Sequence, residues 1–184
     1  MSVTDWKYPG TAVSVSSDWV DPNNAKEDDN LYSSHVFYGK NQSSGLLRLT
    51  NFGFTSSNLP SGCTINGIEF VIAKYANANV ITDSSVYLYD DGRVGNNLAS
   101  ATAWPKSEEA ATYGGATNMC GTSLTQADIV VSTFGVELSV AIGATANMTA
   151  YVDYIKIRVY YTEGGAGSLP LKNVFGRPFS GVFR

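Results

Sequence analysis

The sequence has few charged residues, few cysteines and no long apolar run. Asp, Glu, Lys and Arg make up 15% of its 184 residues, against about a quarter in a typical soluble domain. Long surface helices need many such residues, so the composition favours strands and turns. No stretch of about 18 apolar residues occurs, and no transmembrane helix is expected. The formal net charge of -4 argues against general nucleic-acid binding, which needs a basic surface.

The chain has two cysteines, Cys63 and Cys120, and one histidine, His35. Two distant cysteines form neither a disulfide framework nor a zinc-ligand spacing. We expect two reduced, buried thiols, with a single disulfide as the alternative. One imidazole cannot supply the usual two or three histidines of a metal site. His35 is predicted to be a loop histidine, because sequence neighbours such as serine do not make a catalytic triad.

Acidic residues cluster at 27–29 and at Asp90-Asp91. Loops rich in oxygen ligands can hold calcium. Turn formation explains Asp90-Asp91-Gly92 equally well, and the calcium-loop spacing of an EF-hand is absent. We therefore predict no metal, no cofactor and no catalytic residue, and we expect a protein that is not an enzyme. The first residues lack the basic and apolar regions of a secretory signal, so none is expected.

Residues 150–161 have the clearest strand pattern in the chain. β-Branched and aromatic residues dominate, without Gly or Pro. Apolar residues recur at every second position, namely Ile155, Ile157 and Val159. Lys156 and Arg158 fall on the opposite face, which indicates one buried and one solvated side of a sheet. Asp153 falls on the apolar side, so we expect either a bulge there or a hydrogen-bonded carboxylate.

At least six strand candidates separated by turn signals occur, without alternating helices. They predict an all-β fold, an antiparallel β-sandwich that is jelly-roll-like, with extended terminal arms. The expected parts are an N-terminal arm or entry strand over 1–11, the sandwich over 12–163, and a Gly-rich linker with an aromatic tail over 164–184. Residues 134–142 and 150–161 are predicted to form an antiparallel pair, and 125–129 one helical turn capped by Thr125.

The C-terminal tail is apolar, aromatic and basic. Exposed phenylalanines without a partner promote association, so we expect the tail to dock on this domain or on a neighbour. The predicted contact residues are Leu169, Phe175, Arg177, Phe179 and Phe183.

The Ser/Thr/Gly-rich segment 93–123 is long for a loop, which is typical of a functional or assembly surface. Aromatic rings exposed on a β-sandwich can stack on sugar rings, and Trp104 and Tyr113 are the candidates for glycan binding in this segment. The same rings would serve equally well as core anchors. The segment 18–45 is a second candidate for a glycan site, and Trp19 is expected to anchor it to the core.

Several motifs together resemble a loosely defined group of virion-associated β-sandwich proteins of tailed bacteriophages. The resemblance covers about residues 17–161, and one departure lies at 120–124, where a tryptophan-rich stretch is expected. The matching segments are Trp19 with Asp21-Pro22-Asn23-Asn24-Ala25, Asn51–Phe54, Leu59–Ile68, Tyr113-Gly114-Gly115, Thr125–Ile129, Phe134-Gly135-Val136 and Tyr151–Ile155.

This resemblance implies a structural protein of the virion that binds the major capsid protein or another particle component, as in capsid decoration. A homo-oligomer is expected, with a trimer as the first guess, and neither nucleic acid nor membrane as a partner. The alternative is a fibre or adhesin module that binds carbohydrate on a host surface. A hydrolase is the least favoured class, since no nucleophile–base pair is evident.

Overall fold

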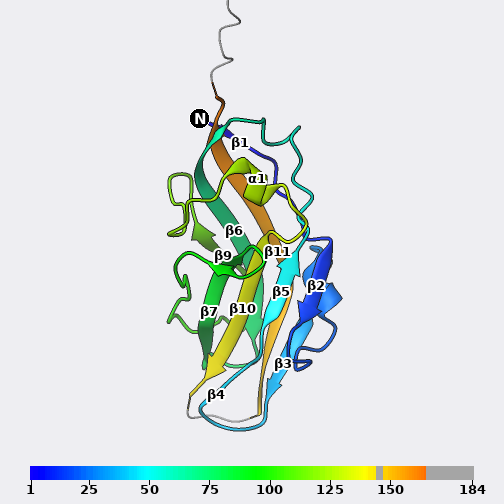
Figure 1. Cartoon of the computed structure of the whole chain (residues 1–184). Coiled ribbons are helices and arrows are strands. Elements are labelled where there is room, and N and C mark those ends of the chain that lie inside the picture. The colour runs from blue at the N-terminus through cyan, green and yellow to red at the C-terminus, as the bar shows by residue number, and fades with distance from the viewer. Residues whose placement is uncertain (144–146, 165–184) are drawn as a thin grey trace, which may run out of the picture.

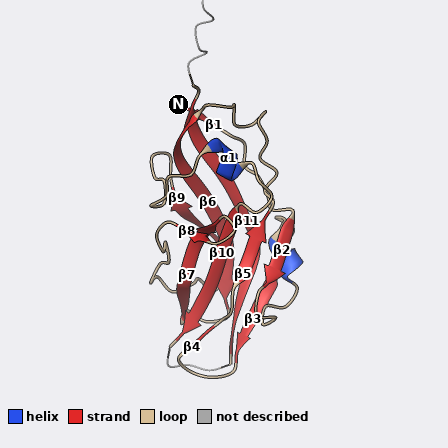
Figure 2. Cartoon of the chain, in the orientation of Figure 1, coloured by secondary structure: helices blue, strands red, loops and turns tan. Residues whose placement is uncertain are grey.

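The computed structural model describes residues 1–143 and 147–164. Two antiparallel sheets face each other and enclose the core, and strands are the main regular structure (Figures 1 and 2). Sheet A contains β1 (Ser2–Val3), β3 (Ser33–Phe37), β6 (Thr64–Ala76), β9 (Glu109–Gly114) and β11 (Met148–Thr162). Sheet B contains β2 (Thr11–Ser14), β4 (Gln42–Ser43), β5 (Leu47–Thr50), β7 (Ile81–Tyr89), β8 (Arg93–Val94) and β10 (Gly135–Ile142).

The strand order is that of a jelly roll, so the predicted all-β sandwich is confirmed. Sheet A has the strand order β3–β11–β6–β9, and β1 also pairs with β11. Sheet B has the order β2–β5–β10–β7–β8, and β4 also pairs with β10. Successive long strands alternate between the sheets, which is how a double Greek key closes its core. Two short helices complete the fold, a 3₁₀ helix η1 (Pro22–Ala25) and α1 (Gln126–Ile129).

The predicted pairing of 134–142 with 150–161 is wrong, because these strands lie in opposite sheets. β10 pairs with β5 and β7, whereas β11 pairs with β6, β3 and β1. Each strand has the expected buried face. Alternation alone, however, does not tell which sheet a strand joins.

β11 is the central strand of sheet A and confirms the pattern at 155–159. Ile155, Ile157 and Val159 are fully buried, and Lys156 and Arg158 lie half-buried on the outer face. The core between the sheets is continuous and apolar. Its largest fully buried side chains include Phe37, Phe70, Trp104 and Phe134.

The N-terminal residues lie along β11. Ser2 pairs with Tyr161, and Lys7 forms a bridge with Ile157. The N-terminus and the last described residues therefore lie at the same end of the sandwich (Figure 1).

The helical turn predicted at 125–129 with Thr125 as its cap is confirmed as α1. Asp128 accepts hydrogen bonds from both the backbone N–H and the hydroxyl of Thr125, each at 2.7 Å, as in a capping box. β5 ends at Thr50, and the next residue, Asn51, adopts a positive φ of 60°. No helix within the described part of the chain is long and apolar enough to span a bilayer.

Candidate functional site

Trp104 and Tyr113, the predicted glycan residues, meet around one buried carboxylate. Asp83 of β7 accepts hydrogen bonds from Trp104 Nε1 at 2.8 Å and from the Tyr113 hydroxyl at 2.7 Å. Lys74 Nζ lies 2.7 Å from Asp83 Oδ1, and the backbone N–H of Ser100 donates to Oδ2 at 2.9 Å. Four donors therefore satisfy the carboxylate, which leaves little capacity for a ligand.

The expectation of exposed stacking rings at these positions is wrong. Trp104 is 1% exposed and Tyr113 is 7% exposed, and Tyr113 stacks on Phe70 with a centroid distance of 5.1 Å. Burial lowers the pKa of Lys74, although Asp83 opposes the shift, and burial and Asp83 together raise the pKa of Tyr113. A cavity of about 380 Å³ opens between this cluster and β9. The rings anchor the 93–123 segment to the core, the alternative that the sequence left open.

A different set of aromatic side chains gathers on the outer face of sheet A. They come from the N-terminal segment, the loop before β3, β6 and β11, and six of the seven are at least partly exposed. We call this set the aromatic face: Trp6, Tyr8, Tyr32, Tyr75, Tyr151, Tyr154 and Tyr160.

In one half of the aromatic face, the basic side chains of Lys156 and Arg158 lie against the aromatic rings. The rings of this half are Trp6, Tyr8, Tyr154 and Tyr160. Trp6 packs against a small apolar cluster that includes Tyr154, which fastens the N-terminal segment to the sheet. Lys156 Nζ lies 4.7 Å from the centroid of Tyr154 and 5.4 Å from that of Trp6, while the Arg158 guanidinium lies 4.4 Å from Trp6. Tyr8, with 37% of its surface exposed, meets Tyr154 edge-to-face at 5.8 Å.

Polar groups flank these rings. Arg158 donates to both carboxylate oxygens of Glu69, at 3.0 and 3.1 Å, and the Tyr160 hydroxyl donates to Glu69 at 2.7 Å. Burial and Glu69 raise the pKa of Tyr160, so its hydroxyl keeps its proton. The face therefore offers fixed donors and acceptors beside its rings.

The other half of the aromatic face consists of three tyrosines. Tyr75 and Tyr151 are direct cross-strand partners and stack with centroids 4.5 Å apart and an interplanar angle of 10°. Tyr32 meets both rings edge-on, at 5.1 and 6.1 Å. Burial and the neighbouring Glu108 raise the pKa of Tyr32 to about 12. Such offset and edge-on pairs hold the rings in fixed orientations.

Asp153 lies in a bulge of β11 between the two halves. The pairing with β6 shifts between Val152 and Ile155, which confirms the bulge as one of the two expected explanations. Neither carboxylate oxygen has a partner of good hydrogen-bond geometry among the described residues. Burial raises the pKa of Asp153 to about 6, and the charges of Glu108, Asp28 and Asp29 add to that shift, although the nearby Asp29 backbone N–H lowers the pKa.

The sequence contained a signal for the aromatic face that composition alone did not reveal. The outward positions of β11 alternate with its buried residues and form a row of aromatic and basic side chains that the sequence pattern already indicates. These positions are Tyr154, Lys156, Arg158 and Tyr160. The contributions of Trp6 and Tyr32 could not be found this way, because long-range pairing brings their segments to the sheet.

Both thiols are free, as predicted. Cys120 is buried as expected, whereas Cys63 is only half-buried and departs from the prediction of two buried thiols. His35 is in β3 and not in a loop, and its Nδ1 lies 3.0 Å from the Asp18 carbonyl oxygen. Within residues 1–143 and 147–164, no three His, Cys, Asp or Glu side chains are placed to hold a metal ion. The predicted tail contacts, Leu169, Phe175, Arg177, Phe179 and Phe183, lie outside the described residues.

No protein-family model and no curated protein sequence matches this chain. Several solved structures are similar at very low identity and with TM-scores below 0.5. A putative sugar binding protein from Bacteroides thetaiotaomicron is 8% identical, with a TM-score of 0.40 and coverage of 84% of this chain and 87% of that chain. The N-terminal cellulose-binding domain of Cellulomonas fimi β-1,4-glucanase C is 8% identical, with a TM-score of 0.36 and coverage of 86% and 88%.

A CBM36 domain of a multidomain xylanase from the hindgut metagenome of Trinervitermes trinervoides is 12% identical. Its TM-score is 0.31, and the match covers 90% of this chain and 98% of that domain.

Proposed function

We propose that this protein is a non-catalytic carbohydrate-binding module that holds an extended glycan along the aromatic face of sheet A. This is the carbohydrate alternative that the sequence left open. The observation that supports it is the gathering of seven aromatic rings on one outer sheet face, flanked by Glu69, Lys156 and Arg158.

The chemistry of the face suits a sugar chain. The C–H faces of sugar rings stack on aromatic rings, and their hydroxyls need donors and acceptors at the rim. Glu69 accepts hydrogen bonds, and the Arg158 guanidinium and Lys156 ammonium donate them. The face contains aromatic groups that are already oriented by their neighbours, so little side-chain entropy would be lost on binding.

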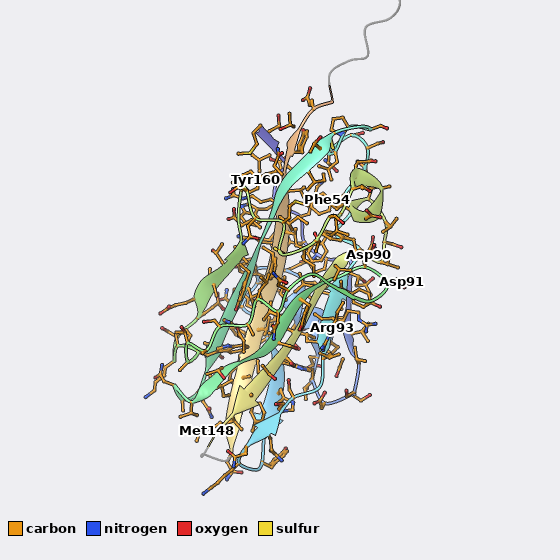
Figure 3. The ribbon with its side chains drawn as sticks, turned by 60° about the vertical axis from the view of Figure 1, so that its left-hand side comes forward. Phe54, Asp90, Asp91, Arg93, Met148 and Tyr160 are labelled. Carbon is orange, nitrogen blue, oxygen red and sulfur yellow. The ribbon has the colours of Figure 1, made fainter. Side chains whose placement is uncertain are left out.

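The dimensions of the face favour a chain over a single sugar. Tyr151 and Tyr160 lie near opposite ends of β11, which runs the length of the sandwich between Met148 and Tyr160 in Figure 3. Nine residues of strand span roughly 30 Å. Each ring contributes only about 1 kcal/mol by stacking, so affinity should rise with the number of sugar units bound.

Affinity electrophoresis of the full chain tests the proposal. The gels would contain soluble xylan, β-glucan, hydroxyethyl cellulose or galactomannan, and cellulose and chitin would be tested by pull-down. We expect retardation or retention by at least one polysaccharide. The double variant Tyr8→Ala/Tyr160→Ala should lose roughly tenfold or more in affinity, because two stacking rings are removed.

A matched control is Tyr87→Ala, which removes a half-buried tyrosine from the outer face of sheet B. This variant should bind like the unmodified chain. Absence of binding to every polysaccharide, or equal binding by the Tyr8/Tyr160 double variant, would overturn the proposal.

The virion-associated role stays a prediction from the sequence. It depends on the tail and on partners that are absent from the described structure. A fibre or adhesin module would combine a particle-bound protein with the glycan binding proposed here.

A further inference from the structure

A cavity that shares no lining residue with the aromatic face lies between β3 of sheet A and β4 of sheet B. Its volume is about 490 Å³, which falls in the range of small-molecule sites. Segments before β3, within β3 and at β4 form the walls. The lining residues are Asp18, Val20, His35, Val36, Tyr38, Gln42 and Ser43.

The wall combines apolar surface with an open aromatic ring. Tyr38 is 79% exposed and Val20 is 55% exposed. Large apolar side chains this exposed at the mouth of a cavity offer a contact surface to a ligand, with little rearrangement needed. Tyr38 also forms no aromatic pair among the described residues.

The Asp18 carboxylate has unused capacity to accept hydrogen bonds. Its side chain is 32% exposed, and Oδ2 lies 3.6 Å from His35 Nδ1. It accepts one hydrogen bond, from the backbone N–H of Gly45, whereas an ionised carboxylate can accept about four. Oδ1 is buried and has no partner among the described residues, so a ligand in the cavity would meet this carboxylate at Oδ2.

A side chain at position 45 would displace Asp18 from its present position. A Cβ at Gly45 would lie 2.5 Å from Asp18 Oδ1 and 2.5 Å from Ser16 Oγ. The indole Nε1 of Trp19 donates to the Gly45 carbonyl at 3.0 Å, and Trp19 is 3% exposed, which confirms it as the anchor of this segment. The carboxylate is therefore held in place at the wall of the cavity.

Donors lie beside this acceptor. The side-chain oxygen of Gln42 accepts the backbone N–H of Gly39 at 2.9 Å, which orients the amide and leaves its NH₂ group to donate. The hydroxyl of Ser43, which is exposed, can donate or accept. A ligand matched to this wall must both donate and accept, as the hydroxyl groups of a sugar do. An ammonium group only donates and would leave Gln42 without a partner.

We propose that this cavity is a second ligand site, which binds a single sugar unit through its hydroxyl groups, with Tyr38 against the sugar ring. The site is separate from the aromatic face and does not depend on glycan binding there. Asp18 accepts from the ligand, Gln42 donates to it, and Ser43 does either.

Protein-observed NMR of the full chain tests this site. ¹⁵N-labelled protein would be titrated with D-glucose, D-galactose, D-mannose and N-acetyl-D-glucosamine, with lysine and inorganic phosphate as non-polyol probes. We expect saturable shifts of the Gln42 side-chain amide and the Gly45 N–H with at least one sugar. Asp18→Asn and Tyr38→Ala should each weaken that binding by about tenfold, from the loss of a charged acceptor or of a stacking ring.

Tyr38→Ala guards against a folding artefact, because this exposed side chain supports no packing. Tyr8→Ala on the aromatic face is the matched control and should leave the sugar titration unchanged. Saturable shifts with lysine or phosphate alone, no shift with any sugar, or sugar binding unaffected by both Asp18→Asn and Tyr38→Ala would overturn the assignment.

Discussion

Lys74 of β6 and Asp83 of β7 form an ion pair 2.7 Å long that joins the two sheets inside the sandwich. Their side chains are 6% and 0% exposed. Lys74 Nζ also lies 4.7 Å from the centroid of Trp104 and 5.1 Å from that of Tyr113. A buried charge pair of this kind is costly to break, because the remaining partner has no water to replace the lost charge.

Lys74→Met should therefore destabilise the protein. Asp83 would keep three neutral donors but lose its counter-charge, so we expect a loss of about 3 kcal/mol in the free energy of unfolding. Urea denaturation followed by tryptophan fluorescence measures it. Lys40→Met, at an exposed lysine, is the control and should change stability by less than about 0.5 kcal/mol. Equal stability of the two variants would show that the pair is not a structural link.

Because the carboxyl group of Asp153 is buried, we predict that the protein loses this group's contribution to stability as the pH rises from acid to neutral. Its folded-state pKa of about 6 lies above the ordinary value of 3.8, so the folded protein keeps a proton that the unfolded chain releases. This contribution to the free energy of unfolding is present at low pH. It falls as the pH rises through the window between these two pKa values and is lost above it.

Asp153→Asn removes this effect and should stabilise the protein by up to about 3 kcal/mol at pH 7. Thermal unfolding at several pH values measures the change. Asp128→Asn is a control for which the opposite change in stability is expected. The Thr125 hydroxyl and N–H lower the pKa of Asp128 in the folded protein. Asp128 therefore stabilises the fold at neutral pH, and this contribution is lost as the pH falls. If the unmodified chain and Asp153→Asn had parallel pH profiles, the proposed origin of the shift would be excluded.

The two cysteines should differ in reactivity. Burial raises the pKa of Cys120 to about 11 and also raises that of Cys63, which is only half-buried. The thiolate is the reactive form. At pH 8 in native buffer we expect slow reaction of one thiol with a chromogenic disulfide, and reaction of both in urea. Cys63→Ser should abolish the native-state reaction. Rapid labelling of both thiols in the folded protein would contradict the packing around Cys120.

The sequence was sufficient to predict the fold class and the faces of the central strand. Ile155, Ile157 and Val159 alternate with Lys156 and Arg158, and this local period reports directly on burial. The same pattern could not assign β10 and β11 to opposite sheets, because a strand with one buried face fits either sheet.

The candidate sites were harder to predict, because they depend on contacts between distant segments. Trp104 and Tyr113 share Asp83, and neither neighbours it in the sequence. At the cavity between β3 and β4, Asp18 lies next to His35, 17 positions away in the sequence. A single histidine in the sequence does not indicate which residue will contact it. Aromatic residues reveal their role only when the fold shows whether the rings are buried.

The tail prediction can be tested with the domain intact, because β11 ends at Thr162 and a 1–163 truncation keeps every described strand. We expect light scattering after size exclusion to show an oligomer for the full chain and a monomer for the truncation. The physical reason is that exposed phenylalanines promote association. A full-length variant with Phe175, Phe179 and Phe183 changed to Ser is the matched control and should also be monomeric. An oligomer that persists in both would place the interface on the sandwich and remove the tail from self-assembly.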